Sequence, residues 1–117
     1  MSDIKPDPYA AACPSRKILS IISDKWSLLV IPLLIKKPLR HAELLKAIEG
    51  ISQKMLTQTL RRLEQHGLVE RHDYHEVPPR VDYRLTKLGR SLSGIIGELD
   101  NWVIDNFDSL TAPAHKA

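Results

Sequence analysis

Within the segment Ile51–Gly67, hydrophobic residues recur with the period of an α-helix. Leu56, Leu60 and Leu63 follow the i, i+4, i+7 spacing that places side chains along one stripe of a helix. The opposite side carries amides, a hydroxyl and cations, with no carboxylate at its centre. The pattern predicts an amphipathic helix with one buried face and one polar face.

Capping residues mark where the predicted helices begin and end. Asp24, Ser52 and Thr86 can each accept a free backbone N–H in the first turn of a helix. Cys13 precedes a proline, which suits a first turn because its missing N–H loses nothing there. Gly67 suits the left-handed conformation that often ends a helix. These positions predict helices over about 14–22, 25–36, 41–48, 51–67 and 86–107.

The helix over about 25–36 is almost wholly apolar, so it should form the buried centre of the domain. Pro32 lies inside it and removes the backbone hydrogen bond to the carbonyl of Leu28, so we expect a kink there. Pro38 to Arg40 should then form an extended link. Glu49-Gly50 should make the turn after the helix predicted over about 41–48.

Two segments after the amphipathic helix alternate between apolar and polar residues, as half-exposed strands do. They are Leu68 to Tyr74 and Arg80 to Leu85, and a turn with Val77-Pro78-Pro79 joins them. Two helices separated by a turn, a hairpin and a long final helix follow one another in this order. The order predicts a mainly α winged helix-turn-helix fold, with the β-hairpin as the wing.

The polar face of the amphipathic helix matches the chemistry of DNA base edges. Arg and Lys can donate to the two acceptors of guanine in the major groove, and Gln can pair with the acceptor and donor of adenine. Any soluble helix can carry such residues on its wet side, so the surrounding helix-turn-helix and hairpin favour DNA here. The residues of this helix predicted to contact DNA are Ser52, Gln53, Lys54, Thr57, Gln58, Arg61 and Arg62.

The hairpin adds cations beside the groove. Arg80 at the base of the wing and Arg71 on the opposing strand are predicted to contact phosphates, which contribute affinity without sequence information. His72, Asp73 and His75 could be considered as metal ligands, but they lack a fourth ligand and a second shell. We therefore predict no metal site and no cofactor.

Four segments carry a family resemblance: KWSLL (Lys25 to Leu29), PLRHAEL (Pro38 to Leu44), ISQKMLTQTLRRLEQHGLVER (Ile51 to Arg71) and VPPRVDYRLTKLGRSL (Val77 to Leu92). Together they resemble the HxlR-type bacterial transcriptional regulators, relatives of the MarR group, from about Cys13 to Phe107. The resemblance implies a DNA-binding regulator. It also implies that the N- and C-terminal helices form a two-fold dimer interface.

The hydrophobic content of the chain indicates that a partner subunit covers part of its surface. A chain of 117 residues forms a single small domain, and 43% hydrophobic residues are more than it can hide. The simplest partner is a second copy, and the homodimer would place two recognition helices on an inverted-repeat operator of double-stranded DNA. We expect a flexible arm over 1–12, which could wrap the partner, the domain over 13–108 and a disordered tail over 109–117. One continuous stripe should cover the last helix: Leu88, Leu92, Ile95, Ile96, Leu99, Trp102, Val103 and Phe107.

Several classes of protein are disfavoured. The acidic, proline-interrupted start is unlike a signal peptide, and the longest apolar run, Trp26 to Ile35, is too short to span a bilayer. Together with a single cysteine, this predicts a cytoplasmic protein without an internal disulfide.

An enzyme is not predicted, because the sequence contains no nucleophile elbow, phosphate loop or paired acid–base cluster. The alternative function is a winged helix that binds only other proteins. The net charge of +3 is compatible with nucleic acid but does not establish it.

Cys13, the single thiol, is the candidate sensor. Its place at a helix start with Arg16 and Lys17 nearby should favour the reactive thiolate. The family resemblance implies sensing of oxidants or electrophiles at such a cysteine. Oxidation could end in a bridge between the two Cys13 residues of a dimer, a mixed disulfide with a small thiol, or an adduct with a compound such as a quinone. The alternative is an inert cysteine packed at the dimer interface.

Overall fold

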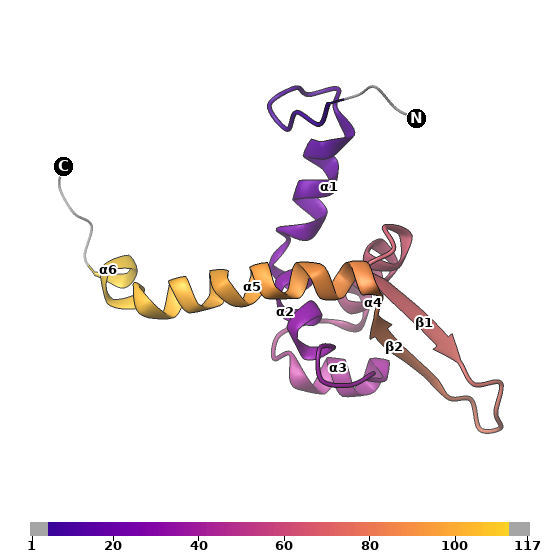
Figure 1. Ribbon diagram of the computed structural model, residues 1–117. Helices are drawn as coiled ribbons and strands as arrows, with labels where there is room; N and C mark the ends of the chain where they lie inside the picture. Colours follow the sequence, from indigo (N-terminus) through magenta and orange to yellow (C-terminus); the bar gives the residue numbers. More distant parts are fainter. Residues whose placement is uncertain (1–4, 113–117) are drawn as a thin grey trace.

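The computed structural model describes residues 5–112 (Figure 1). In this part of the chain a helical body carries a two-stranded antiparallel hairpin on one side, and a long final helix extends away on the other. The first helix stands off the body, and the hairpin projects as the wing. This is the predicted mainly α winged helix-turn-helix. The elements are α1 Pro14–Ile22, α2 Lys25–Leu33, α3 His41–Ala47, α4 Gln53–Gln65, β1 Val69–Asp73, β2 Val81–Leu85, α5 Lys87–Asp105 and α6 Phe107–Thr111.

The predicted helix caps are confirmed. The carboxylate of Asp24 accepts two backbone N–H groups in the first turn of α2. The hydroxyl of Ser52 accepts the N–H of Met55 at 3.0 Å, and that of Thr86 accepts the N–H of Gly89 at 3.0 Å. These local bonds satisfy backbone donors that have no partner within the helix, which is why each helix begins where it does.

The core forms where α2 and α4 pack together. The leucine stripe of α4 is buried as predicted, and α2 supplies the centre of the cluster with Val30 and Ile31, both fully buried. Residues from α3, both strands and α5 close the cluster around them. The buried apolar residues are Val30, Ile31, Leu34, Leu44, Ile48, Ile51, Leu56, Leu60, Leu63, Leu68, Val69, Leu85 and Ile96.

Two glycines fix the path between α4, β1 and α5. Gly67 has φ +73°, the left-handed conformation expected at the end of α4. Gly89 in α5 lies so close to β1 that an added Cβ would meet the carbonyl oxygen of Leu68 at 2.1 Å. The start of α5 is therefore packed directly against the backbone that leaves α4.

The prediction that the second helix continues to about Lys36 with a kink is wrong, because α2 ends at Leu33. Pro32 lies in its last turn, where its missing N–H removes only the bond to the carbonyl of Leu28. The N–H groups of Leu34 and Ile35 instead bond to carbonyls three residues back, at 3.1 and 3.3 Å. The chain therefore leaves α2 through a tight turn directly after Pro32.

The C-terminal expectations also need correction. A single helix to about Phe107 is wrong, because α5 ends at Asp105 and α6 begins at Phe107. Asn106 lies between them with φ −109° and ψ 13°, and its side-chain amide and its backbone N–H both donate to the carbonyl of Trp102, at 2.9 and 3.0 Å. Ser109 belongs to α6, so the expected disordered tail cannot begin there. Residues 113–117 of that predicted tail lie outside the described residues.

The start of the chain folds back on α1. Residues 1–4 of the predicted arm lie outside the described residues, and the remainder forms turns. The guanidinium of Arg16 in α1 donates to the carbonyls of Pro8 and Tyr9 at 2.9 and 2.8 Å. These bonds hold the arm against the first turns of its own helix.

The wing is also attached to the link before α3. In the hairpin, Val69 pairs with Leu85 and Arg71 with Tyr83. The link before α3 is extended, as predicted, and Leu39 exchanges two backbone hydrogen bonds with Tyr83, at 3.0 and 2.8 Å. This bridge fixes the beginning of α3 beside β2.

Across residues 5–112, none of the helices is both long and apolar enough to cross a membrane.

Candidate nucleic-acid interface

The outward face of α4 is accessible along its length. With Leu56, Leu60 and Leu63 buried, the polar residues of the same helix other than the buried Thr59 point away from the core. Gln58 is half-buried, and the other predicted contact residues of this helix are exposed. The exposed ones are Ser52, Gln53, Lys54, Thr57, Arg61 and Arg62. The hydroxyl of Ser52 is engaged in capping, whereas the amides and cations are presented to solvent.

The first residue of α3 joins this surface, which the sequence pattern did not predict. The Nε2 atom of His41 lies 3.1 Å from the hydroxyl oxygen of Thr57, in hydrogen-bonding contact. The contact holds the start of α3 against the middle of the exposed face of α4. The turn at Glu49-Gly50, as predicted, joins the two helices.

A network of polar side chains braces the wing. The Tyr74 hydroxyl donates to a carboxylate oxygen of Asp82 at 2.6 Å, and a guanidinium N–H of Arg84 donates to the other at 3.2 Å. Burial raises the pKa of the Asp82 carboxyl, but the hydrogen bonds from Tyr74 and Arg84 outweigh it, so the pKa lies below its ordinary value. The pKa of the Arg84 guanidinium is raised in turn, chiefly by its hydrogen bond to Asp82. Asp82 is therefore a buried, charged and fully engaged carboxylate.

Arg80 lies at the tip end of the wing, so its expected place at the base is wrong. The backbone N–H of Tyr74 bonds to the carbonyl of Arg80 at 3.0 Å, and β2 begins at the next residue. The guanidinium carbon of Arg80 lies 4.1 Å from the centroid of the Tyr74 ring. Arg71 is exposed further toward the base, opposite Tyr83. The two predicted phosphate contacts therefore occupy different levels of the hairpin.

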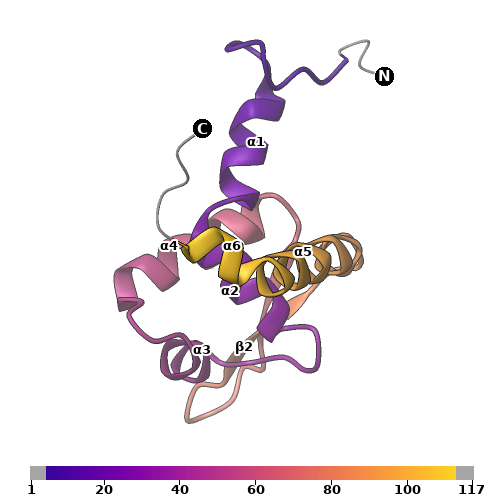
Figure 2. The same cartoon turned by 90° about the vertical axis from the view of Figure 1, so that its left-hand side faces the viewer.

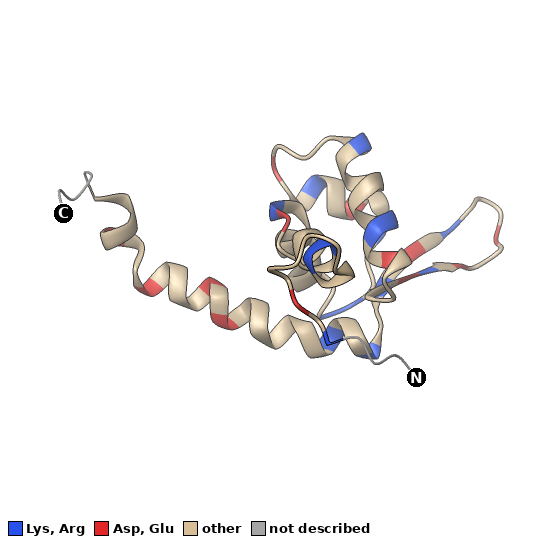
Figure 3. Ribbon diagram, turned by 90° about the horizontal axis from the view of Figure 1, so that it is seen from above, with Lys and Arg blue, Asp and Glu red and all other residues tan. Residues whose placement is uncertain are grey.

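Within the described residues, Lys and Arg are confined to one end of the molecule, up to the start of α5. Figure 3 shows Lys and Arg mixed with some Asp and Glu over the helical body and the hairpin, and Lys and Arg at the start of α5, whereas the farther part of α5 carries Asp and Glu alone. After Arg90, the charged residues of α5 are Glu98, Asp100 and Asp105. Because like charges repel phosphates, the body and the wing are the parts suited to a polyanion.

Cys13 is the N-cap residue of α1, at the end of that helix farthest from the body (Figure 1). The pKa of its thiol lies below the ordinary value, chiefly because of the hydrogen bond with the Ser15 hydroxyl, at 3.2 Å, and next because of the N–H of Asp7 at 3.3 Å. The predicted direction agrees, but the cause differs. The guanidinium of Arg16 is turned to backbone carbonyls of the arm and not to the sulfur.

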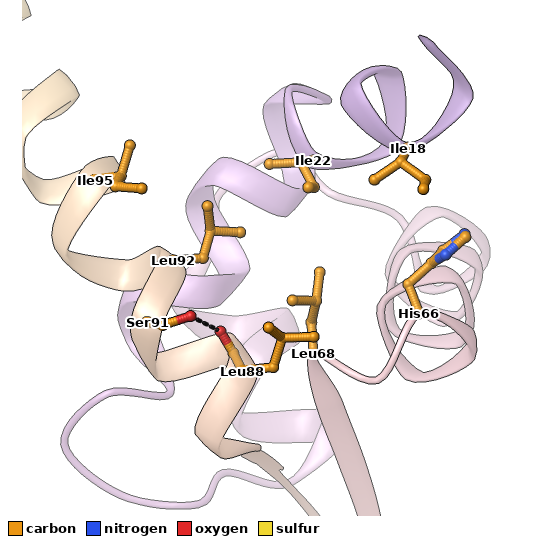
Figure 4. A pocket seen from close by; sticks show the side chains of 8 residues that line it. All are labelled: Ile18, Ile22, His66, Leu68, Leu88, Ser91, Leu92 and Ile95. Atoms are coloured by element: carbon orange, nitrogen blue, oxygen red, sulfur yellow. Dashed lines mark hydrogen bonds between the residues drawn. The ribbon is translucent and has the colours of Figure 1, made fainter. Parts of the chain in front are cut away.

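An apolar hollow of about 370 Å³ opens where α1, α5 and the end of α4 meet (Figure 4). Ile18 and Ile22 line it from α1, and Leu92 and Ile95 from α5. His66, the C-cap residue of α4, adds an imidazole to the wall. The hollow therefore touches both the predicted dimer helices and the end of α4.

The wing histidines have other contacts. The ring of His72 packs edge-on against Tyr74, with centroids 4.3 Å apart. Asp73 accepts the backbone N–H of His75 at 2.8 Å. Within the described residues, no three His, Cys, Asp or Glu side chains are grouped so as to hold a metal ion.

Comparisons with known proteins agree on one family. The sequence profile described as HxlR-like helix-turn-helix matches residues 21–111. The HTH-type transcriptional regulator YtfH of Escherichia coli (strain K12) is 38% identical over 104 residues, covering 89% of this chain and 82% of that protein. The structure of ytfH from Salmonella typhimurium has a TM-score of 0.86 at 35% identity, covering 92% of this chain and 96% of the other. The redox regulator HypR in its reduced form has a TM-score of 0.78 at 37% identity, covering 86% and 99%.

The network of Tyr74, Asp82 and Arg84 gives a prediction about pH. Asp82→Asn should lower the free energy of unfolding by about 1 kcal/mol at neutral pH, because Arg84 loses its charged partner. A carboxyl whose pKa is depressed on folding stabilises the fold above its unfolded pKa of about 3.9, and this contribution is lost as the pH falls through the folded-state value. Urea unfolding at several pH values should show the difference from wild type fading below about pH 4. Asp100→Asn on exposed α5 is the control, and an equal difference at all pH values would contradict the assigned charge.

Proposed function

Because this chain belongs to the HxlR-like helix-turn-helix family of transcriptional regulators, which are not enzymes, we propose that it binds an inverted-repeat operator in double-stranded DNA as a homodimer. The observation that carries the proposal is the exposed row of amides and cations on α4, a helix whose opposite face is locked into the core. Acting on chromosomal DNA, the protein would work in the cytoplasm. The alternative is a winged helix that binds only other proteins. That function would not require the exposed amides and cations of α4.

In the proposed complex α4 lies in the major groove. Gln53, Lys54, Gln58 and Arg61 would contact base edges, because their amides and cations match the donors and acceptors displayed there. The flanking residues of α4, with Arg71 and Arg80 of the wing, would contact the sugar-phosphate backbone. Specificity and affinity would thus come from different elements.

The homodimer is supported by apolar side chains that α1 and α5 leave uncovered. Ile95 is 64% exposed and Trp102 is 54% exposed, and Leu99 lies between them on α5. A row of this kind on a small domain marks an interaction surface. Ile18 and Leu19 extend the exposed apolar surface onto α1. A two-fold interface through these helices would set two α4 helices about 34 to 36 Å apart, in successive major grooves.

The dimer can be tested at the exposed end of α5. We expect wild type to be a dimer in size-exclusion chromatography with light scattering, and Trp102→Asp to be a monomer with weakened operator binding. Asn101→Asp adds the same charge at the neighbouring exposed position and should remain dimeric. A wild-type protein that is monomeric at micromolar concentration would remove the basis for an inverted repeat.

Specificity and affinity can be separated on the DNA. Gln58→Ala and Arg61→Ala should each cost about 1 to 3 kcal/mol on the operator and relax base preference. Arg80→Ala should weaken binding to all DNA sequences alike and reduce the dependence of affinity on salt concentration. Gel-shift titrations with the DNA upstream of the protein's own gene and with unrelated DNA measure both effects. If Arg80→Ala leaves the affinity and the salt dependence unchanged, Arg80 does not contact phosphate.

We propose further that Cys13 senses oxidants or electrophiles. The supporting observations are the lowered pKa of its thiol, which favours the reactive thiolate, and the similarity to a redox regulator. A bridge to the second Cys13, a mixed disulfide with a small thiol, or a quinone adduct would change the contacts at the start of α1. A structural role at the dimer interface is the alternative.

Diamide or quinone treatment should change the operator affinity of wild type and leave Cys13→Ser unchanged, because the variant has no thiol. Mass spectrometry of the same samples identifies the product. If neither the affinity nor the mass of wild type changes, Cys13 is structural. The hollow beside His66 would then be the place for a small effector, since a molecule there would contact the end of α4 directly.

A further inference from the structure

We propose that a second hollow, between α3 and the wing, seats one backbone phosphate of the bound DNA, held by Lys37, Arg40 and Arg80. The inference rests on the proposed DNA binding and deepens it. It assigns Lys37 and Arg40, which lie outside both the recognition helix and the hairpin, to the same phosphate as the wing arginine.

The hollow is built from three separate segments. It has a volume of about 410 Å³ and is lined by Lys37 and Arg40 of the link, Ala42 and Glu43 of α3, and Arg80 and Asp82 of the wing. The two hydrogen bonds between Leu39 and Tyr83 clamp the link alongside β2, which brings these segments together. The cations of the link and of the wing therefore face one shared space.

The two acids in the wall are already engaged. Asp82 accepts hydrogen bonds from Tyr74 and Arg84. A carboxylate oxygen of Glu43 accepts the backbone N–H of Arg40 at 2.9 Å. Among residues 5–112, neither of the ion pairs involves a cation of this hollow. The three cations are thus left for an external anion, and a phosphate accepts bidentate bonds from Arg.

Arg80 is oriented before any ligand binds. Its guanidinium stacks on the ring of Tyr74, and the hydroxyl of that ring is fixed by buried Asp82. A stacked guanidinium uses its face and keeps the N–H donors of its edge available. Because the side chain is already ordered, less conformational entropy is lost when it binds.

The position of the hollow selects the ligand. His41, which contacts Thr57 on the exposed face of α4, lies between Arg40 and Ala42 of the hollow. Figure 2 shows α3 between α4 and β2. When a recognition helix occupies the major groove, the first helix of the motif crosses the sugar-phosphate strand that borders the groove. A strand that passes from α4 toward the wing must therefore cross this hollow.

The first test removes one cation at a time. Lys37→Ala and Arg40→Ala are compared with Lys36→Ala, which removes an exposed cation next in sequence that does not line the hollow. The probe is a short duplex selected by wild type from a random pool, with an unrelated duplex alongside. We expect both hollow variants to weaken binding to either duplex by about 10-fold and Lys36→Ala to change little. The double variant should lose less than the product of the two effects, because both side chains hold one phosphate.

The second test identifies the phosphate. Methylphosphonates, which carry no charge, replace the phosphates of the selected duplex one at a time. For wild type one position in each half-site should be sensitive. At that same position both Arg40→Ala and Arg80→Ala should be clearly less sensitive than wild type, because two of the three cations remain, while Lys36→Ala stays as sensitive as wild type. Circular dichroism melting establishes that each variant is folded. Loss of sensitivity at different positions for the two arginines, or at none, overturns the shared seat.

Failure of this inference differs from failure of the proposed function. If wild type binds duplex DNA but Lys37→Ala and Arg40→Ala bind as wild type does, only the phosphate seat is wrong. If wild type selects and binds no duplex at all, the proposed DNA binding is wrong and the seat fails with it.

Discussion

Burial of the leucine stripe of α4 against α2 is the constraint on which the DNA-facing surface depends. Leu56, Leu60 and Leu63 are each almost completely inaccessible, and burying a leucine side chain contributes roughly 1.5 to 3 kcal/mol. Turning α4 about its axis would forfeit several such contributions, comparable to the roughly 5 to 15 kcal/mol that stabilises a whole domain. The helix therefore has a single orientation, and the side chains opposite the leucines are held outward without needing contacts of their own.

The same constraint connects the ends of the molecule. Gly67 turns the chain out of α4 into β1, and Leu68 is buried beside Gly89 at the start of α5. Since no side chain separates α5 from the backbone of Leu68, a shift of α5 would be passed to the residues that follow α4. His66 lies at the same junction and faces the hollow between α1 and α5. A signal that alters the packing of the proposed dimer helices would thus reach the recognition helix over a short path.

Local chemistry explains which parts of the fold could be predicted from the sequence. The caps at Asp24, Ser52 and Thr86 involve neighbours within a few residues, so the starts of these helices follow from side-chain type. Periodicity likewise predicted the buried stripe of α4 and the wing. The ends of the helices did not follow from the pattern: α2 ends one residue after Pro32, and Asn106, with φ −109° and ψ 13°, separates α5 from α6.

Contacts between distant residues explain what could not be predicted at the candidate site. The pattern shows that Thr57 is exposed but not that His41, sixteen positions earlier, bonds to it. It shows cations at Arg40 and Arg80 but not that the bridge of Leu39 brings them to one hollow.

The sequence also understates the charge of the DNA-facing part. Residues 91–112 carry four acids and no Lys or Arg, so without them the net charge of +3 becomes +7 for the rest of the chain. Their acids lie along the farther part of α5 and on α6, away from α3 and the wing. A mildly basic average therefore combines a strongly basic body with an acidic, apolar helix end. This division would keep the proposed dimer surface off the phosphate backbone, because the acids that flank the apolar stripe are repelled by it.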